Sequence, residues 1–446
     1  MSNLFRRCAA ALVGLVLIAT TWSSPAAAQR SAVKAVGAMA VPSVPPAILR
    51  VARKYKGQTI LFYGPNIGTE MKTAVALAKK FSQQTGINVK FNPMPSSATD
   101  QYSTYQRVFT SHSSAIDVAD LDVIWPGAFA PYLLNLKSAA ASETKGMFRY
   151  LVKNNMVNGK LVALPWFENH ALLWYRTDLL KKYHISGPPK TWDQLAADAR
   201  KIQAGEQKTN KNFHGYVFQG NAYEGLTCDA MEWVASSGGG TFVNRKGQVT
   251  IDNPKATAML NRVRSWVGSI APVGVTTYEE TDSMNAFAAG DAAFLRNWLY
   301  AGTVSGAPGS VIRGKFFAEA IPAASGQKHV STFGGSILGV NKYSKHPDAA
   351  TQFVLYMGSV PGETYWTLQA GDPPAVIAVQ NNPAVLKAEP WLRIQEGGVA
   401  RPSTVLGPHY NQASTIIFQG VNQILRGTNA SSVLPGMRSQ LQALLR

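Results

Sequence analysis

Residues 159–180 read GKLVALPWFENHALLWYRTDLL, and the organisation of the whole chain is inferred from this stretch. Two apolar, strand-like runs are separated by Pro165 and by the polar trio Glu168, Asn169 and His170. Proline cannot donate to a strand ladder, so we expect Pro165 to end the first run. The pattern indicates a chain that crosses from one structural body to another. Aromatic rings beside hydrogen-bonding groups at a crossing are typical of a cleft for a polar small molecule, although a buried strand pair with core aromatics fits the same residues.

The length and composition predict a globular chain with more than one lobe. Its 446 residues exceed what one compact core usually serves, and 46% hydrophobic residues exclude a disordered chain. The 43 Lys and Arg residues outnumber the 25 Asp and Glu residues, for a formal charge of +18. These basic residues are scattered rather than gathered in runs, so we interpret the charge as a solvated surface and expect no nucleic-acid partner.

The N-terminus predicts export. Arg6 and Arg7 precede an apolar run at 9–20, and small residues at 24–28 provide a cleavage site, so residues 1–28 are expected to be a cleaved signal peptide. The run is too short to span a membrane. Cys8 precedes it, so no lipoprotein anchor is expected. The mature protein should be periplasmic, with a flexible leader over 29–57.

The order of the expected elements indicates an α/β fold. A strand at 58–63, a helix at 70–84 and a strand at 87–91 form a parallel unit. Asp120 and Asp122 lie at the end of a buried strand, where open α/β sheets bind their ligands. Further helices are expected at 178–184, 191–203, 224–235, 254–270, 283–289, 347–357, 362–369 and 410–425, and further strands at 214–219, 292–300, 316–321 and 332–340.

The motifs of common catalytic sites are missing from the sequence. It contains no HExxH, GxSxG or CxxC motif. Glu168 and His170 share one side of a strand and could form an acid–base pair. Glu279 and Glu280 are interpreted as a solvated pair rather than as the facing acids of a glycosidase. We therefore expect no catalytic residue, no metal and no cofactor.

Seven segments, in order over residues 58–446, carry a resemblance to a known family. They are LDVIWPG (121–127), NGKLVALPWF (158–167), AYEGLTC (222–228), EWVAS (232–236), FLRNW (294–298), VNKYSK (340–345) and RPST (401–404). The chain resembles the family 1 extracellular solute-binding proteins of carbohydrate ABC importers, in the branch that binds trehalose, maltose and α-glucosides. The resemblance implies the two-lobed type II periplasmic-binding-protein fold, with lobe 1 at 58–166 and 320–358, lobe 2 at 167–319 and 359–446, and a hinge at 168–171.

The resemblance also implies which residues hold the ligand. Carboxylates would accept hydrogen bonds from sugar hydroxyls, an arginine would donate across the cleft, and two tryptophans would stack on the sugar. The implied ligand-binding residues are Glu70, Asp122, Trp166, Asn169, Glu224, Trp298, Gly335 and Arg401. Structural roles stay open for several of them, since Asp122 and Arg401 could form a salt bridge and Trp298 could belong to the core.

Three departures from the family pattern leave the identity of the ligand open. Ser336 stands where relatives usually carry a tryptophan, Gln101 stands where they often carry an arginine, and residues 371–374 replace a Tyr-Asn-Pro segment. The missing tryptophan removes an aromatic platform worth about 0.5–1.5 kcal/mol beyond its buried area.

The sequence therefore predicts a monomeric, periplasmic substrate-binding component that captures a glucoside disaccharide, such as trehalose, maltose or sucrose, and delivers it to a membrane permease. Three alternatives remain. A protein of the same fold could bind a polyol or a polyamine, as Ser336 and the 371–374 segment suggest. A secreted carbohydrate-active enzyme and a polyanion binder are the others, and the second of these is motivated by the charge.

Overall fold

The computed structural model describes residues 39–394 and 397–446. The predicted signal peptide and the first part of the predicted leader lie outside the described residues. Within these ranges, no helix is long and apolar enough to cross a membrane.

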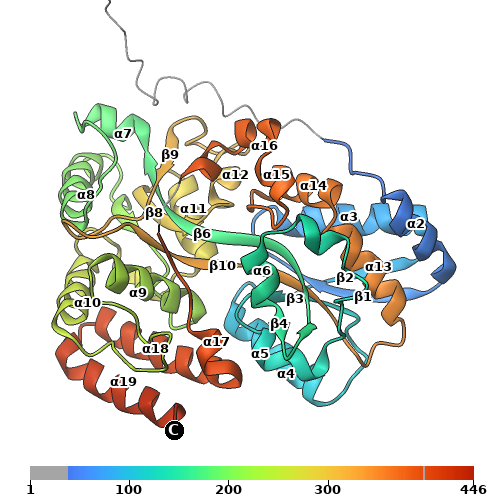
Figure 1. Cartoon of the computed structure of the whole chain (residues 1–446). Coiled ribbons are helices and arrows are strands. Elements are labelled where there is room, and N and C mark those ends of the chain that lie inside the picture. Colours follow the sequence, from blue (N-terminus) through green and yellow to red (C-terminus); the bar gives the residue numbers. More distant parts are fainter. Residues whose placement is uncertain (1–38, 395–396) are drawn as a thin grey trace, which may run out of the picture.

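In the described part of the chain, a mixed sheet of nine strands runs through the molecule, with helices packed around it (Figure 1). The strands are β1 (Thr59–Gly64), β2 (Asn88–Pro93), β3 (Val118–Asp122), β6 (Leu164–Arg176), β7 (His214–Val217), β8 (Ala292–Trp298), β9 (Phe316–Glu319), β10 (Val330–Val340) and β11 (Gly397–Val399). Seven of them follow the order β2-β1-β3-β10-β6-β8-β7, while β11 pairs with β10 and β9 with β6. The short strands β4 (Met156–Val157) and β5 (Lys160–Leu161) form a separate hairpin.

The helices surround this sheet. The α-helices are α2 (Pro46–Ala52), α3 (Glu70–Thr85), α4 (Ala98–Thr110), α5 (Pro126–Phe129), α6 (Arg149–Asn154), α7 (Thr177–Lys182), α8 (Trp192–Glu206), α9 (Glu224–Ser236), α10 (Pro254–Trp266), α11 (Glu280–Ala288), α12 (Ala301–Ser305), α13 (Pro347–Met357), α14 (Val360–Ala370), α15 (Ile377–Gln380), α16 (Pro383–Ala388), α17 (Ser403–Leu406), α18 (Tyr410–Leu425) and α19 (Ala430–Leu444). Short 3-10 helices are η1 (Arg53–Tyr55), η2 (Ala130–Tyr132), η3 (Glu143–Gly146), η4 (Val273–Thr277), η5 (Pro390–Arg393) and η6 (Gly407–His409).

β1, α3 and β2 form the strand–helix–strand unit that the sequence predicts. β1 pairs in parallel with β2 on one side and with β3 on the other. α3 buries Ala74, Leu77 and Phe81 completely, because these residues recur on one face at helical spacing. The helix ends at Gly86, whose φ of 77° is readily adopted by glycine. This part of the molecule, with α4, α5, α6 and α13, is called the first half below.

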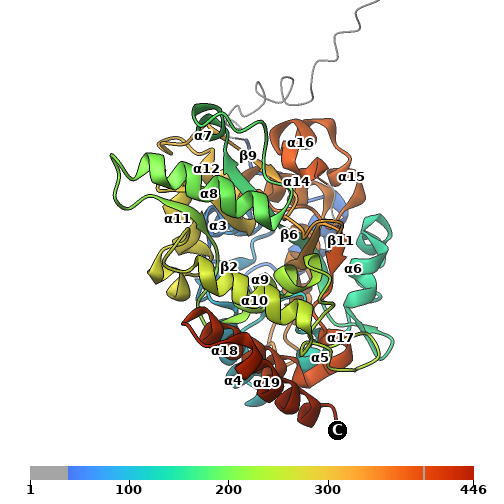
Figure 2. The ribbon, with the colours of Figure 1, turned by 90° about the vertical axis from the view of Figure 1, so that its left-hand side faces the viewer.

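The second half contains β7, β8 and β9 with the helices α8, α9, α10, α18 and α19. Figure 2 shows α8, α10, α18 and α19 on the outer side of this half. Thr191 begins α8 with a capping box that includes Gln194, as the helix predicted from Thr191 onward requires. α18 packs against α9 and α19 through an apolar face that includes Ile417 and Val421.

α14 lies on the other side of the predicted lobe boundary. The sequence-based division places residues from 359 onward in lobe 2, but α14 packs against α3 of the first half. Its Trp366 ring lies 4.1 Å from the ring of Trp166, between centroids. The helix therefore belongs with the first half, where its aromatic residues find their packing partners.

β6 and β10 are the strands that cross between the halves. β6 pairs with β10 up to His170, with β8 from Ala171 onward and with β9 from Leu173 onward. The change of partner falls within the predicted hinge at 168–171. The expectation that Pro165 ends a strand was wrong, because β6 continues through it as one strand. The ladder shifts register next to Pro165, and such a bulge is one of the places where a strand tolerates proline.

Candidate ligand-binding site

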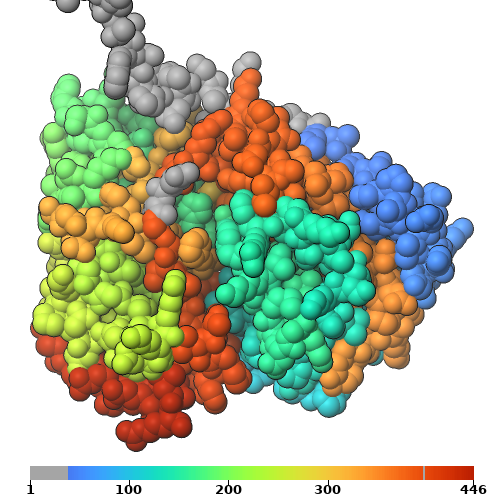
Figure 3. Space-filling model, in the orientation of Figure 1, coloured from blue at the N-terminus to red at the C-terminus, as the bar shows by residue number. Residues whose placement is uncertain are grey.

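A cavity of about 130 Å³ lies beside the crossing strands. Its walls come from α3 and β3 in the first half, from α9 and the end of β8 in the second half, and from β6 and β10. The volume is below the range of about 300–1,000 Å³ that most ligand pockets enclose, so the two halves stand close together. Figure 3 shows one face of the molecule, where the chain around α17 (orange-red) fills the space between the halves.

Arg401 joins the two halves inside this cavity. Its Nη1 and Nη2 donate to the two carboxylate oxygens of Asp122 at 3.0 and 2.7 Å, and Nη1 also donates to Glu224 Oε1 at 3.0 Å. Asp122 ends β3 of the first half, whereas Glu224 begins α9 of the second half. Only 3% of the Arg401 side chain is exposed. One cation therefore offsets two carboxylates that approach from opposite sides of the cleft.

Glu224 is a fixed part of the wall. The hydroxyls of Tyr410 and Ser414 on α18 both donate to its carboxylate at 2.5 Å. Burial raises the pKa of Glu224, while the charge of Arg401 acts to lower it. Its backbone N–H donates to the hydroxyl oxygen of Thr99 on α4 at 3.2 Å, which adds a second contact between the halves.

Three further carboxylates, those of Glu70, Asp120 and Glu280, line the same cavity. Burial raises the pKa of Glu70 well above its usual range, and the charge of Asp372 raises it further. Burial likewise raises the pKa of Asp120, with a contribution from the charge of Asp122. Among the described residues, no group of three or more acidic, histidine or cysteine side chains could hold a metal ion. The cavity thus presents many hydrogen-bond acceptors in a place where negative charge is unfavourable.

Trp298 forms an aromatic wall at the end of β8. Its indole N–H donates to Glu280 Oε1 at 3.3 Å, and the guanidinium of Arg296 lies 4.4 Å from its ring centroid. Arg296 is held in turn by two hydrogen bonds of 2.8 and 2.6 Å to the carboxylate of Glu232. The ring therefore rests on a buried, charge-paired support and its position is fixed.

Asn169 is anchored by the protein. Its amide nitrogen donates to Asp372 Oδ1 at 2.9 Å, and its amide oxygen accepts from the backbone N–H groups of His170 and Leu299 at 3.0 and 3.2 Å. Burial raises the pKa of Asp372 to about 7. Asn169 thus ties β6 to the end of β8 at the edge of the cavity.

Gly335 and Ser336 bring β10 close to the cavity. Gly335 has a φ of 123°, and a Cβ atom there would stand 2.4 Å from the carbonyl oxygen of Phe167, so only glycine fits. Ser336 lies opposite both Asp122 on β3 and Phe167 on β6. Its hydroxyl donates to Asp120. The residue that replaces the family's usual tryptophan is therefore bonded to one of the cavity's acids.

Seven of the eight predicted ligand-binding residues line the cavity. They are Glu70, Asp122, Asn169, Glu224, Trp298, Gly335 and Arg401. Their contact with a ligand stays a prediction. The salt bridge considered for Asp122 and Arg401 is present, so these two residues already serve a structural purpose.

Trp166 is the predicted residue that the structure places elsewhere. Its side chain is fully buried in the core of the first half, against Phe62 and Trp366. Trp166 is the extra residue at the β6 bulge, because Phe167 pairs with Ser336 and Pro165 with Ile337. Phe167 consequently lines the cavity in its place.

Sequence reasoning did not include Glu280, Tyr300 or Asp120, which line the cavity, among the ligand-binding residues. Glu280 was interpreted as a member of a solvated pair, which was wrong, because it lines the cavity and accepts from Trp298. Tyr300 follows β8 and carried no signal of its own. Asp120 was recognised with Asp122 at the strand end but was left out of the ligand-binding residues, although it shares its face of the strand with Asp122.

Glu168 and His170 do not form an acid–base pair in the structure. The hydroxyl of Tyr150 donates to Glu168. Burial lowers the pKa of His170 to about 4, so the imidazole is neutral at physiological pH. Neither side chain lines the cavity described above.

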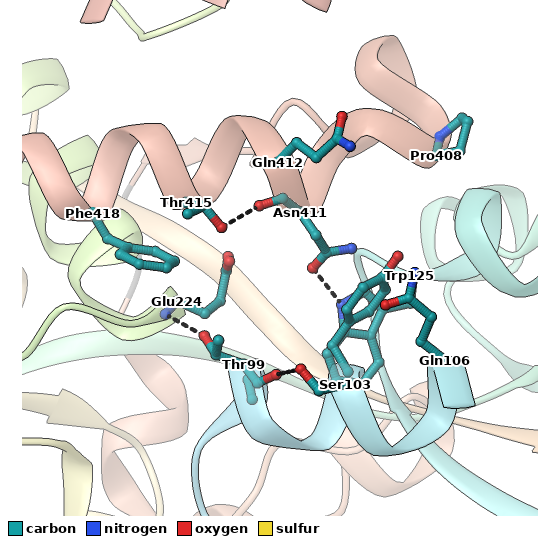
Figure 4. A pocket seen from close by; sticks show the side chains of 12 residues that line it. Thr99, Ser103, Gln106, Trp125, Glu224, Pro408, Asn411, Gln412, Thr415 and Phe418 are labelled. Atoms are coloured by element: carbon teal, nitrogen blue, oxygen red, sulfur yellow. Dashed lines mark hydrogen bonds between the residues drawn. The ribbon is translucent and has the colours of Figure 1, made fainter. Parts of the chain in front are cut away.

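A second cavity, of about 330 Å³, adjoins the first and shares Glu224 and Ala98 with it. It lies between α4 and α18 (Figure 4). The indole N–H of Trp125 donates across it to Asn411 Oδ1 at 3.3 Å. Aromatic rings and carboxamides alternate around its walls, so this chamber offers apolar faces together with hydrogen-bonding groups.

Comparison with known proteins identifies the family. Residues 65–364 match the family model described as bacterial extracellular solute-binding protein. A probable ABC transporter-binding protein of Deinococcus radiodurans is 41% identical over 386 residues, which cover 85% of this chain and 91% of the relative. The structure of maltose-bound MalE3 of T. maritima superimposes with a TM-score of 0.83 and 33% identity, covering 87% of this chain and 100% of the other. A solute-binding protein of Thermotoga lettingae bound to α-D-tagatose has a TM-score of 0.78 at 22% identity, with coverage of 87% and 100%.

These findings confirm the expected type II periplasmic-binding-protein fold and the expected absence of an enzymatic role. The family model and the Deinococcus relative also place the protein in an extracellular or periplasmic family that works with ABC transporters. The chain therefore belongs to the family 1 extracellular solute-binding proteins of carbohydrate ABC importers.

Proposed function

We propose that this protein captures a sugar between its lobes, a glucoside disaccharide such as trehalose, maltose or sucrose, and delivers it to the permease of its importer. The observation that carries the proposal is the meeting, in one cavity, of Asp122 from the first half with Glu224 and Arg401 from the second, beside the ring of Trp298. Carboxylates accept hydrogen bonds from sugar hydroxyls, and an indole covers the C–H faces of a pyranose.

The adjoining chamber between α4 and α18 supports a ligand with two sugar units. The first cavity alone, at about 130 Å³, suits one small ring. The second chamber adds about 330 Å³ and is lined by Tyr102, Trp125 and Phe418 as well as by carboxamides. A disaccharide would place one unit in each chamber, with Glu224 between them.

Lobe closure is the proposed mechanism of capture. A ligand that contacts both halves shifts an open–closed equilibrium by its difference in affinity for the two states. We assign residues 58–166 and 320–370 to the first lobe and residues 167–319 and 371–446 to the second. The mature protein acts as a monomer in the periplasm after cleavage of residues 1–28.

Thermal unfolding of residues 29–446 in the presence of sugars tests the proposal. A ligand that binds only the folded state raises the unfolding midpoint, and saturation at 100 times Kd adds about 2.7 kcal/mol of stability. We expect trehalose, maltose or sucrose to raise the midpoint, and the sugar alcohol ribitol at the same concentration to serve as the comparison. A shift with ribitol and none with any disaccharide would favour the polyol alternative, to which Ser336 points.

A further inference from the structure

The cavity carries more negative charge than a neutral sugar requires. Its lining includes five carboxylates and the single guanidinium of Arg401. Arg401 is already paired with Asp122 and Glu224. Within the described residues, the remaining three carboxylates have no ion-pair partner; they are Glu70, Asp120 and Glu280.

The nearest other cation does not supply the missing charge. Arg296 lies beneath Trp298, and its side chain is 1% exposed. It is ion-paired with Glu232 at 2.6 Å and with Asp229 at 3.2 Å. Its charge therefore serves these two buried acids rather than the cavity.

The buried hydroxyl of Tyr300 has no hydrogen-bond partner in the described part of the chain, and the carboxylate of Glu70 in the same lining accepts no hydrogen bond from it. Glu70 is 6% exposed, and none of the described residues donates a hydrogen bond to its carboxylate. Tyr300 is 3% exposed, and its hydroxyl has no partner. Buried polar groups are almost always hydrogen-bonded, and leaving them without partners is unfavourable. These two side chains point to a ligand that supplies donors at this end of the cavity.

Ser336 lies beside Asp120 in the cavity lining. A tryptophan here would occupy the row that Asp122, Ser336 and Phe167 form across three strands. The serine instead adds one hydroxyl bonded to Asp120. Burial and neighbouring charges raise the pKa values of Glu70 and Asp120, which is the electrostatic sign of carboxylates that lack a cation.

We infer that the captured solute is a sugar-like molecule that carries a protonated amine, and that its ammonium group lies among Glu70, Asp120 and Glu280. An ammonium group has three N–H donors and no acceptor, so it suits a surface made of carboxylates. Among the described residues these carboxylates do not form a metal site, and the cation that we propose is an organic ammonium group. This inference rests on the proposed function, because it names the chemical class of the solute at the same site.

Matched pairs of ligands test the inference by titration calorimetry of residues 29–446 at pH 6.5. D-Glucosamine is compared with D-glucose and N-acetyl-D-glucosamine, and the dimer of glucosamine with cellobiose. We expect each amine to bind at least about tenfold more tightly than its neutral counterpart. Hydrogen bonds between charged groups increase the binding constant more than hydrogen bonds to neutral groups do, by about that factor or more. The affinity of the amine should also fall with added NaCl, while that of a neutral sugar should not.

Variants locate the ammonium group. Glu70→Gln keeps the shape of the side chain and removes one negative charge, so the ratio of amine affinity to neutral-sugar affinity should fall about tenfold or more. Glu280→Gln is a second variant in case the first does not fold. Glu319→Gln is the matched control, because Glu319 on β9 is ion-paired with Lys190 and lies outside the cavity lining. The control should retain the full preference.

The possible results separate the inference from the function on which it rests. Equal or tighter binding of the neutral sugars overturns the inference and leaves sugar capture intact. Amine preference that survives both Glu70→Gln and Glu280→Gln also overturns it, because the charge would then lie elsewhere. If none of these sugars or amines binds, the inference fails, while the proposed function is decided separately by the unfolding test with trehalose, maltose and sucrose.

Discussion

Replacement of the buried Arg401 by glutamine should weaken the contact between the two halves more than the replacement of any exposed charge. The variant loses three hydrogen bonds of 2.7–3.0 Å and leaves the carboxylates of Asp122 and Glu224 facing each other without a cation. Their side chains are 16% and 7% exposed. Removing one partner from a buried ion pair typically costs about 3–5 kcal/mol. That is the loss expected in the free energy of unfolding at pH 7 if the halves stay together.

The halves can also separate, and this would relieve the repulsion by returning both carboxylates to water. Urea unfolding and small-angle X-ray scattering should therefore be measured on the same ligand-free sample. We expect a lower urea midpoint, a larger radius of gyration, or both. Arg262→Gln is the control, because Arg262 and Asp193 form an exposed pair, with 39% and 72% of the side chains accessible, worth less than about 1 kcal/mol.

The pH dependence gives an independent check on the same variant. Burial already raises the pKa of Glu224, and the variant lacks the charge of Arg401 that lowers it. A carboxyl whose pKa is higher in the folded than in the unfolded state destabilises the fold at high pH, and this loss is relieved as the pH falls. The variant should therefore approach the native stability between pH 7 and pH 5. A variant that matches the native protein in midpoint and in radius at pH 7 would refute the reasoning.

Three further predictions concern single side chains. Trp166→Ala should lower the free energy of unfolding in urea by about 3–5 kcal/mol because it empties a core site. Trp298→Ala should instead lower sugar affinity about tenfold, as measured by calorimetry. A loss of affinity in the first variant and a loss of stability in the second would contradict the placement of the two rings. Gly335→Ala should lower the thermal midpoint far more than Gly159→Ala, since both have positive φ but only Gly335 meets a backbone oxygen. In urea titrations, the His170→Gln variant should lose up to about 3 kcal/mol less stability than the native protein when the pH falls from 6.5 to 4. The reason is that a histidine whose pKa is lowered in the folded state stabilises the fold above its unfolded pKa, and this stability is lost on acidification. An unchanged acid profile would show that His170 is not the group responsible.

Local sequence patterns predicted those helices and strands whose defining residues all lie in one continuous stretch of the chain. α18 spans 410–425 as expected, because its apolar residues repeat at helical spacing over four turns. α8 begins after Thr191, where the capping residues indicate the start of a helix. The carboxylates that depend on strand ends, such as Asp122, were found in the same way.

The errors came from features that only long-range packing decides. Trp166 and Phe167 exchange sides because of one extra residue in β6, and a bulge leaves no mark in the local pattern. Glu280 is a pocket residue only because Trp298, on another element, comes alongside it. α14 contacts α3, a helix far away in the sequence, so a local pattern could not assign this contact, and the lobe boundary beside it stays a prediction.

The pairing of the two crossing strands has a mechanical consequence. Gly335 lies opposite Glu168 and Phe333 opposite His170, so β6 and β10 share a hydrogen-bonded ladder where they pass between the halves. Two separate tethers could bend independently, but strands joined in a ladder must twist together. The ladder therefore couples two of the three connections between the halves, and the third lies at residues 370–371. A change in the angle between the halves must then move both paired strands together, so an importer that contacts both rims would sense a coordinated movement.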